Sequence, residues 1–444
     1  MKRQTAQRAR AGEAPSASPR PAPKSALAMA GGGPLGAIYE IGALSALAES
    51  IVGLDLNRLD MYVGVSAGAI LSAALANGIT PREMSRSFIE STPDNAPDEP
   101  ALDPFDPATL MRPALAEYGA ALAKLPPLLA RAAWHLVRPA PRGGRGLLRA
   151  LEHLAPAVPT GLFSNDALRD SLERTFGQAG RSDDFRRLAT RLVVVATDLD
   201  SGQSVEFGTL GHDSVPISLA ATASAALPGM FPPVEIGGRH YVDGALKRTL
   251  HASVALKAGA RLVLCVNPLV PYDDRAAPPD ALPRQRLADG GLSAVIQQTV
   301  RAVISSRMQI GMRQYADEYP HADVLLFEPD HADAELFFSN IFSYANRAWL
   351  CEHAYQKMRE QLWRRRHELS PVLARHGMHL DIAALRDNGR SLVPSARRVT
   401  RSAWLPFGDI AERLDHTLED LGRYVDQARR TGPAGSRARR KASA

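Results

Sequence analysis

The clearest candidate for chemistry in this sequence is a serine, Ser66, in the segment Gly64-Val65-Ser66-Ala67-Gly68. The segment fits the pattern G-x-S-x-G, in which a sharp turn from a strand into a helix lifts a serine hydroxyl clear of a sheet. Gly64 and Gly68 suit such a turn, because larger side chains would clash there. Apolar residues precede the turn and an Ala-rich run follows it, so Ser66 is a candidate nucleophile.

A second glycine-rich segment, Gly31-Gly32-Gly33-Pro34-Leu35-Gly36, fits two functions. Its spacing matches the dinucleotide-binding pattern G-x-G-x-x-G, which also requires an acidic residue at the end of the next strand. That strand instead ends at Ser66, and Asp55 and Asp60 precede it. The favoured interpretation is an oxyanion hole, in which exposed backbone N–H groups of the loop stabilise the charge that develops during acyl transfer.

A third segment, Tyr241-Val242-Asp243-Gly244-Ala245, places a carboxylate before a glycine far downstream. An Asp-Gly pair taken alone marks a turn. Asp243 becomes a candidate catalytic residue only in combination with the two glycine-rich segments.

Short apolar runs alternate with helical patterns along the first two thirds of the chain. We expect strands over 25–30, 59–63, 191–197, 203–207, 261–266 and 324–328, with helices over 36–50 and 67–76. Continuous apolar runs are typical of strands that are buried on both faces. The pattern predicts a layered α/β fold with its site beyond the carboxyl ends of the strands.

Composition divides the chain into four regions, the second of which contains an insertion. We expect a disordered basic tail over 1–24, a catalytic domain over 25–330 with a Pro-rich, cap-like insertion over about 92–161, a helical C-terminal region over 331–428, and a second basic tail over 429–444. The overall net charge of +6 belongs to the ends, because residues 1–30 carry +5 and residues 429–444 carry +6. The remaining chain is mildly acidic, and no nucleic-acid partner is expected.

Taken together, the three segments resemble those of the patatin-like phospholipases. The blocks Val195-Ala196-Thr197-Asp198-Leu199 and Ala223-Ser224-Ala225-Ala226-Leu227-Pro228 extend the similarity, in the order typical of that family. The resemblance covers roughly residues 25–270. It implies a three-layer sandwich with a mostly parallel central sheet, to which the helical insertion and the helical C-terminal part are added.

The resemblance also implies a role for each motif residue. Ser66 would be the nucleophile of a two-residue dyad and Asp243 its base. The oxyanion hole would be formed by backbone N–H groups of Gly31, Gly32, Gly33, Gly36 and Ala67, and the remaining motif positions are Gly64, Gly68, Gly244 and Ala245. The family cleaves lipid acyl esters without a metal or organic cofactor, so we expect neither.

The chain departs from the family pattern at one position, and three alternative functions stay open. Many family members carry Arg or Lys where this chain has Leu35, which favours neutral or weakly charged esters over phospholipids. The chain would then be a neutral-lipid or short-chain esterase. A Ser–His–acid triad is a second alternative, with His212, His240 or His251 as the base, and a non-catalytic lipid-binding protein on the same fold is a third.

The compartment follows from what the sequence contains. Two cysteines, Cys265 and Cys351, are too few for a disulfide framework, and no signal-peptide pattern or apolar run of spanning length occurs. We expect a cytoplasmic protein, with peripheral contact to a membrane or lipid surface left open. The insertion, with Leu128, Leu129, Trp134 and Leu136, is either an interfacial element or a helical cap packed on the core, and the cap is favoured slightly. The oligomeric state is not predicted.

Overall fold

The computed structural model describes residues 24–90, 112–137, 157–273, 275–276, 287–337, 346–394 and 396. Several expectations therefore concern segments outside the described residues. These segments are the two basic tails apart from Lys24, the parts of the insertion over 92–111 and 138–156, and the C-terminal region beyond residue 396.

One mixed, mostly parallel sheet organises the described chain, with the strand order β6-β7-β4-β3-β1-β8-β9 and with β5 paired to β4. Its parallel strands are β1 (Ser25–Met29), β3 (Met61–Val65), β4 (Arg191–Asp198), β8 (Leu262–Val266) and β9 (Asp323–Phe327). The antiparallel ones are β5 (Ser204–Phe207), β6 (Val234–Ile236) and β7 (Arg239–Asp243). The α/β fold with a mostly parallel sheet is confirmed.

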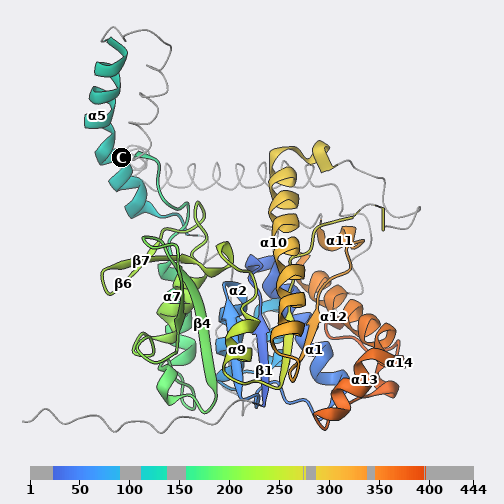
Figure 1. Ribbon diagram of the computed structural model, residues 1–444. Coiled ribbons are helices and arrows are strands. Elements are labelled where there is room, and N and C mark those ends of the chain that lie inside the picture. Colours follow the sequence, from blue (N-terminus) through green and yellow to red (C-terminus); the bar gives the residue numbers. More distant parts are fainter. Residues whose placement is uncertain are drawn as a thin grey trace, which may run out of the picture.

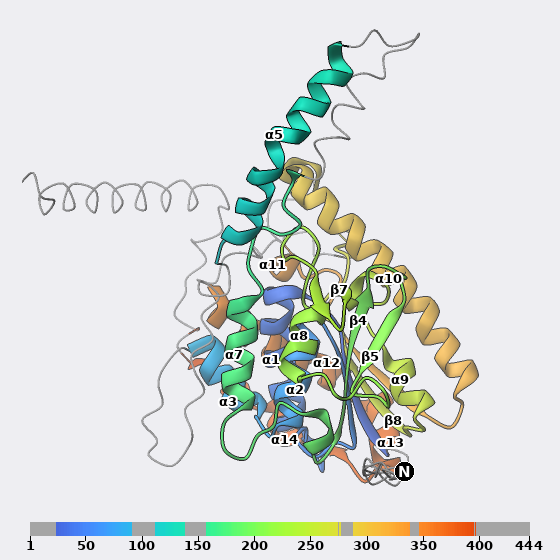
Figure 2. The ribbon, with the colours of Figure 1, turned by 90° about the vertical axis from the view of Figure 1, so that its left-hand side faces the viewer.

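Helices cover both faces of the sheet, as Figure 2 shows. One face packs under α1 (Gly33–Ser50), α2 (Ala67–Ala76), α7 (Asp166–Phe176), α8 (Ile217–Ser224) and α12 (Arg347–Arg364), and the other under α9 (Ala252–Lys257) and α10 (Gly291–Glu318). Successive side chains of β1 alternate between the two apolar clusters, with Leu27 and Met29 in one and Ala26 and Ala28 in the other. The predicted three layers are therefore present.

Element boundaries differ from the sequence expectations by a few residues. The strand expected over 59–63 runs from Met61 to Val65, directly up to Ser66. The helix expected from Gly36 begins at Gly33, because Pro34 is well suited to the first helical turn. The sequence did not predict a small second sheet, in which β2 (Ile51–Val52) pairs with β10 (His379–Leu380).

Shorter helices complete the described chain. They are α3 (Pro81–Met84), the π-helix η1 (Ser85–Glu90), the 3-10 helices η3 (Phe185–Arg187), η4 (Gly244–Leu246) and η5 (Leu287–Gly290), and α11 (Ala334–Phe337), α13 (Arg366–Arg375) and α14 (Ile382–Arg386).

The C-terminal helices are part of the main core rather than an appendage. Leu350, Tyr355 and Leu373 belong to the same buried apolar cluster as the strands. Helix α12 lies against α1, and their closest approach is at Gly42. A Cβ atom at Gly42 would collide with the carbonyl oxygen of Cys351 and lie 3.0 Å from the Cβ of Ala354.

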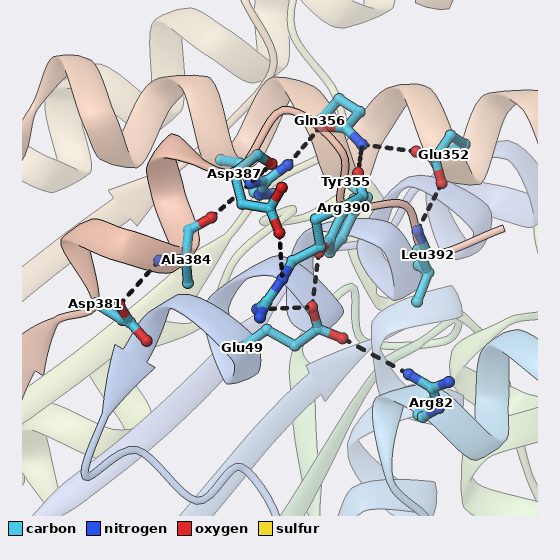
Figure 3. Close-up of polar contacts among 11 residues, drawn as sticks. Glu49, Arg82, Glu352, Tyr355, Gln356, Asp381, Ala384, Asp387, Arg390 and Leu392 are labelled. Carbon is cyan, nitrogen blue, oxygen red and sulfur yellow. Dashed lines mark hydrogen bonds and ion pairs between the residues drawn. The ribbon is translucent and has the colours of Figure 1, made fainter. Parts of the chain in front are cut away.

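Polar contacts, some of them buried, reinforce this packing (Figure 3). The Tyr355 hydroxyl donates to Glu49 of α1 at 2.6 Å, and Arg390 lies 3.6 Å from the same carboxylate. The Glu352 carboxylate of α12 accepts the backbone N–H groups of Leu392 and Val393, both at 2.8 Å. The last described turn is thereby fixed to α12, which itself lies on α1.

Two helices rise above the carboxyl edge of the sheet (Figure 1). They are α10 and α5 (Leu115–Val137), and α5 contains the helix that the sequence analysis placed in the insertion. Leu129 of α5 is 52% exposed. The side chains of Trp134 and Leu136, also candidates for an interface, lie outside what the structure describes. None of the described helices is long and apolar enough to cross a membrane.

The contact between α1 and α12 leads to a stability prediction. We expect Gly42→Ala to lower the free energy of unfolding by about 2–3 kcal/mol, since the added methyl group pushes two packed helices apart. Gly119→Ala in α5 is the matched control, because a Cβ atom there meets nothing within 4 Å. It should be neutral or stabilise by up to ~1 kcal/mol through helix propensity. Chemical denaturation followed by circular dichroism measures both, and equal effects would contradict the close approach at Gly42.

Candidate active site

Ser66 lies at a sharp turn between β3 and α2. Its backbone has φ 55° and ψ −124°, and no other non-glycine residue in the described ranges has a positive φ. Such a conformation costs of order 1–3 kcal/mol and persists only where the surroundings impose it. A Cβ atom at Gly64 would lie 2.5 Å from the Cα of Ala69, and one at Gly68 would lie 2.5 Å from the oxygen of Ala30. Both glycines are thus required by close backbone packing.

The pairing of β4 explains how Asp243 reaches Ser66. Val194 and Val195 pair with both β3 and β5, so these two strands lie on opposite edges of β4. Ala196 and Thr197 pair with both β5 and β7, so β7 also lies opposite β5. Strands β3 and β7 therefore follow one another along the same edge of β4, running in opposite directions and meeting at their carboxyl ends.

The two candidate catalytic side chains meet at this junction. Val65 pairs with Val195 and Asp243 pairs with Ala196, one position further along β4. The Ser66 hydroxyl donates to Oδ2 of Asp243 at 2.6 Å, across 177 positions of sequence. Both residues are buried. The structure thus brings together the serine and the carboxylate that the sequence analysis selected.

Neighbouring groups orient both members of the pair. The Ser66 N–H donates to the Ser224 hydroxyl at 2.8 Å, and that hydroxyl donates to the Val195 carbonyl at 2.6 Å. Oδ1 of Asp243 accepts the N–H of Ala245 at 2.8 Å. The sequence analysis assigned no role to Ser224. In the sequence, Ser224 is marked only by its position in a block of small residues. A buried hydrogen bond between distant segments leaves no pattern in the sequence.

The glycine loop lies beside Ser66, but its residues differ in what they can donate. A Cβ atom at Gly31 would lie 3.0 Å from the Cβ of Ser66. The N–H of Gly31 donates to the Thr249 carbonyl at 3.2 Å, and the N–H of Gly36 donates to the Gly32 carbonyl at 3.0 Å. These two predicted oxyanion-hole donors are therefore engaged elsewhere.

Three of the five predicted donors stay available. No described backbone carbonyl accepts the N–H of Gly32, Gly33 or Ala67. Gly33 begins α1 and Ala67 begins α2, so two helix N-termini, each with partial positive charge, converge on the serine. The arrangement suits the stabilisation of a developing oxyanion.

A cavity of about 920 Å³ opens onto the pair, near the upper end of the usual range for ligand pockets. Ser66 and Asp243 lie in its wall, together with the glycine loop and one side of α10. Most of its lining is apolar, including Leu35, Ile70, Phe88, Leu168, Met230 and Phe231. The site is therefore shaped for a large apolar ligand.

Burial sets the proton affinity of the carboxylate. Removal from water raises the pKa of Asp243 to about 6, although the hydrogen bonds from Ser66 and Ala245 lower it in part. The carboxylate is thus a better proton acceptor than an exposed aspartate and is still ionised at neutral pH.

The three histidines considered for a triad lie apart from this pair. His212 packs against Phe207, and His240 lies exposed on β7 opposite Glu235. His251 is buried, and desolvation lowers its pKa to about 4, which keeps it neutral. Both oxygens of Asp243 already bond Ser66 and Ala245, so the geometry favours a dyad.

The acidic residues near the first strands bond backbone groups away from the glycine loop. Asp60 accepts the N–H groups of Lys24 and Ser25 at the amino end of β1, away from the glycine loop. Asp55 accepts the N–H of Asn57. Within the ranges described, no group of three or more His, Cys, Asp or Glu side chains is placed to hold a metal ion.

The sequence profile of the patatin-like phospholipases matches residues 27–256, which is more than half of the chain. No curated protein sequence matches the chain.

Three solved structures resemble the chain at low identity. VipD from Legionella pneumophila is 16% identical, with a TM-score of 0.34, over 77% of this chain and 67% of that one. The ExoU–SpcU complex from Pseudomonas aeruginosa is 18% identical, with a TM-score of 0.27, over 78% and 52%. Human GIVD cytosolic phospholipase A2, in complex with a fluorophosphonate inhibitor, is 15% identical, with a TM-score of 0.22, over 55% and 40%. The match thus spans about half the length of the chain from the ExoU–SpcU complex. TM-scores this low do not bear on function.

The buried carboxylate leads to a prediction about stability and pH. The pKa of Asp243 in the folded protein exceeds the unfolded value of about 3.9, so the folded state keeps a proton that the unfolded chain releases between about pH 4 and 6. Stability contributed by Asp243 therefore falls as pH rises through that window. We expect Asp243→Asn to gain up to about 3 kcal/mol over wild type between pH 4 and pH 7. Urea unfolding at several pH values tests this, and a difference that stays constant with pH would contradict it.

Proposed function

Because the chain belongs to the patatin-like phospholipase family, we propose that it hydrolyses acyl esters of lipids with Ser66 as nucleophile and Asp243 as general base. The observation that carries this proposal is the 2.6 Å hydrogen bond from the Ser66 hydroxyl to the buried Asp243 carboxylate, in the wall of a large apolar cavity. A serine is a weak nucleophile unless an adjacent base accepts its proton.

In the first half of the reaction, Oγ of Ser66 attacks the ester carbonyl carbon while Oδ2 of Asp243 accepts the hydroxyl proton. The carbonyl oxygen becomes an oxyanion, which the free N–H groups of Gly32, Gly33 and Ala67 are placed to stabilise. The C–O bond to the alcohol then breaks, and the alcohol leaves with the proton from Asp243. The product of this half is an acyl ester of Ser66.

In the second half, water replaces the alcohol. Asp243 accepts a proton from the water, whose oxygen attacks the acyl carbonyl, and the same N–H groups stabilise the second oxyanion. The bond to Oγ of Ser66 breaks, the proton returns to Oγ, and the fatty acid is released. The pKa of about 6 at Asp243 suits both transfers, because the group is ionised at rest and still readily protonated.

The cavity favours a lipid over a small ester as the substrate. Its volume of about 920 Å³ and its apolar lining match the needs of a long acyl chain more closely than those of a short one. The intact dyad and the free N–H donors argue against a protein that only binds lipid.

Lipid esters reside in membranes or micelles, so the cavity must reach an interface. The helices α5 and α10, which rise above the carboxyl edge of the sheet, carry exposed apolar side chains (Figure 1). Leu122 of α5 is 64% exposed and Leu292 of α10 is 76% exposed, and neither lines the cavity. This favours peripheral contact with a lipid surface.

The direct test compares fatty-acid release by wild type, Ser66→Ala and Asp243→Asn from phospholipid, lysophospholipid, acylglycerol and nitrophenyl esters. We expect Ser66→Ala to lose activity entirely and to resist fluorophosphonate labelling. Asp243→Asn should lose about 10²–10⁴-fold in kcat, since it keeps the shape of the site but removes the base.

Two control variants keep this test specific. Ser45→Ala removes another buried serine, one that bonds only within its own helix, and should keep full activity. His251→Gln should also stay active, because the dyad does not use a histidine. Full labelling and hydrolysis by Ser66→Ala, or loss of activity in His251→Gln with Asp243→Asn unaffected, would refute the proposal.

The pH dependence of the wild-type enzyme gives a further prediction. Since Asp243 must be ionised to accept the serine proton, kcat/KM should rise with pH and level off above about 6. A stopped assay with a nonionisable acylglycerol substrate measures this limb. A profile that is flat between pH 5 and 7 would rule out Asp243 as the base.

A further inference from the structure

Arg301 is an exception in the wall of the cavity. Helix α10 lines the cavity mainly with apolar residues such as Ile296, Val300 and Ile304, and Arg301 lies among them. Only 6% of Arg301 is exposed, although arginine is rarely buried without a partner. This position requires a physical reason.

Among the described residues, no hydrogen-bonding or acidic group pairs with the Arg301 guanidinium. The guanidinium instead packs on the aromatic ring of Phe337. Its Cζ lies 4.7 Å from the ring centroid. No hydrogen bond or ion pair to a described residue involves Arg301. The guanidinium nitrogens are not among the fully buried side-chain nitrogen and oxygen atoms that lack a hydrogen bond. Since they make no hydrogen bond to a described residue, they keep some accessible surface. They therefore face open space, and the space that Arg301 lines is the cavity.

Another buried arginine provides the contrast. Arg359 is 4% exposed, and its guanidinium donates to the carbonyls of Ala384 and Asp387 and to Gln356. Burial of a charge without such partners is costly. Desolvation lowers the pKa of Arg301 to about 10, which leaves it charged at neutral pH. An anion that enters the cavity would supply the missing partner.

We propose that Arg301 is an anion subsite of the acyl cavity, which binds an oxyanion carried on the same molecule as the acyl chain. This inference rests on the proposed function. The shared chemistry is a singly charged oxygen group on a lipid, either the phosphodiester of a phospholipid head group or the carboxylate of a released fatty acid. A guanidinium matches both, because its planar N–H groups bond two oxygens at once.

The subsite alters what the glycine loop implies about substrate choice. Leu35, which lines the same cavity, removes a cation from the loop. Arg301 returns a cation to the cavity from a different element, α10. The absence of a charge at residue 35 therefore does not limit the enzyme to neutral esters, and anionic lipids belong among its substrates.

The test uses Arg301→Met, which keeps a long unbranched apolar stem but removes the guanidinium and its charge, with Arg301→Lys as the conservative variant. Arg313→Met is the matched control, because Arg313 is an exposed arginine of α10 outside the cavity lining. In the activity arm, KM for a short-chain phosphatidylglycerol should rise at least tenfold in Arg301→Met. KM for a neutral diacylglycerol of the same chain length should change less than twofold.

A binding arm separates this inference from the proposed function. In Ser66→Ala protein, calorimetric titration with the phosphatidylglycerol and with oleate does not depend on turnover. The Ser66→Ala protein is compared with the Ser66→Ala, Arg301→Met double variant. If the double variant loses affinity for the phosphatidylglycerol alone, the subsite binds the head group. Loss for oleate alone assigns it to the product carboxylate, and both losses support the proposal for either source.

Stability distinguishes a binding role from a structural one. Removing an unpaired buried charge should leave the thermal midpoint of Arg301→Met unchanged or raise it, and Arg301→Lys should keep part of the affinity. Equal losses on neutral and anionic lipids, together with a lowered midpoint, would overturn the proposal and reduce Arg301 to a packing contact with Phe337. If no ester is cleaved by wild type while the binding arm holds, the proposed function fails and the subsite stands.

Discussion

The site depends on two strands that share one edge of β4. Strand β3 runs up this edge and leaves it at Ser66, and β7 enters from the opposite direction and stops one position further on, at Asp243. If the chain continued straight after Val65, β3 would occupy the positions that β7 needs. The abrupt turn at Ser66, with its φ of 55°, is therefore a condition of the sheet as well as of the chemistry.

The same junction determines the electrostatics. At this junction only 3% of Asp243 is exposed, and the loss of hydration raises its pKa. Two short hydrogen bonds, one from Ser66 and one from Ala245, compensate the buried charge. A protein selected for stability alone would not keep a carboxylate here, so the arrangement illustrates how reactivity and stability oppose one another at an active site.

Local patterns in the sequence were sufficient for six strands of the main sheet, the first two long helices and the serine turn, because each depends on the periodicity or turn chemistry of adjacent residues. They did not predict the antiparallel strands β6 and β7. The carboxylate was identified only through family resemblance, since the pairing of β7 with β4 is a long-range register that no nearby residue encodes. Ser224 was missed for the same reason. In the sequence, nothing distinguishes Arg301 from the other charged residues around it. Only the structure places it in the cavity wall, with the Phe337 ring as its neighbour.

Helix α1 has an unusual position, because its two ends belong to different parts of the protein. Its first residues form the glycine loop beside Ser66, and near its last turn Glu49 meets Tyr355 and Arg390 from the C-terminal helices. The family profile ends at residue 256, far before those helices. A fragment cut near that boundary would expose the flank of α1 that α12 covers. The core around α1 is therefore completed by the C-terminal helices, well past the segment that defines the family.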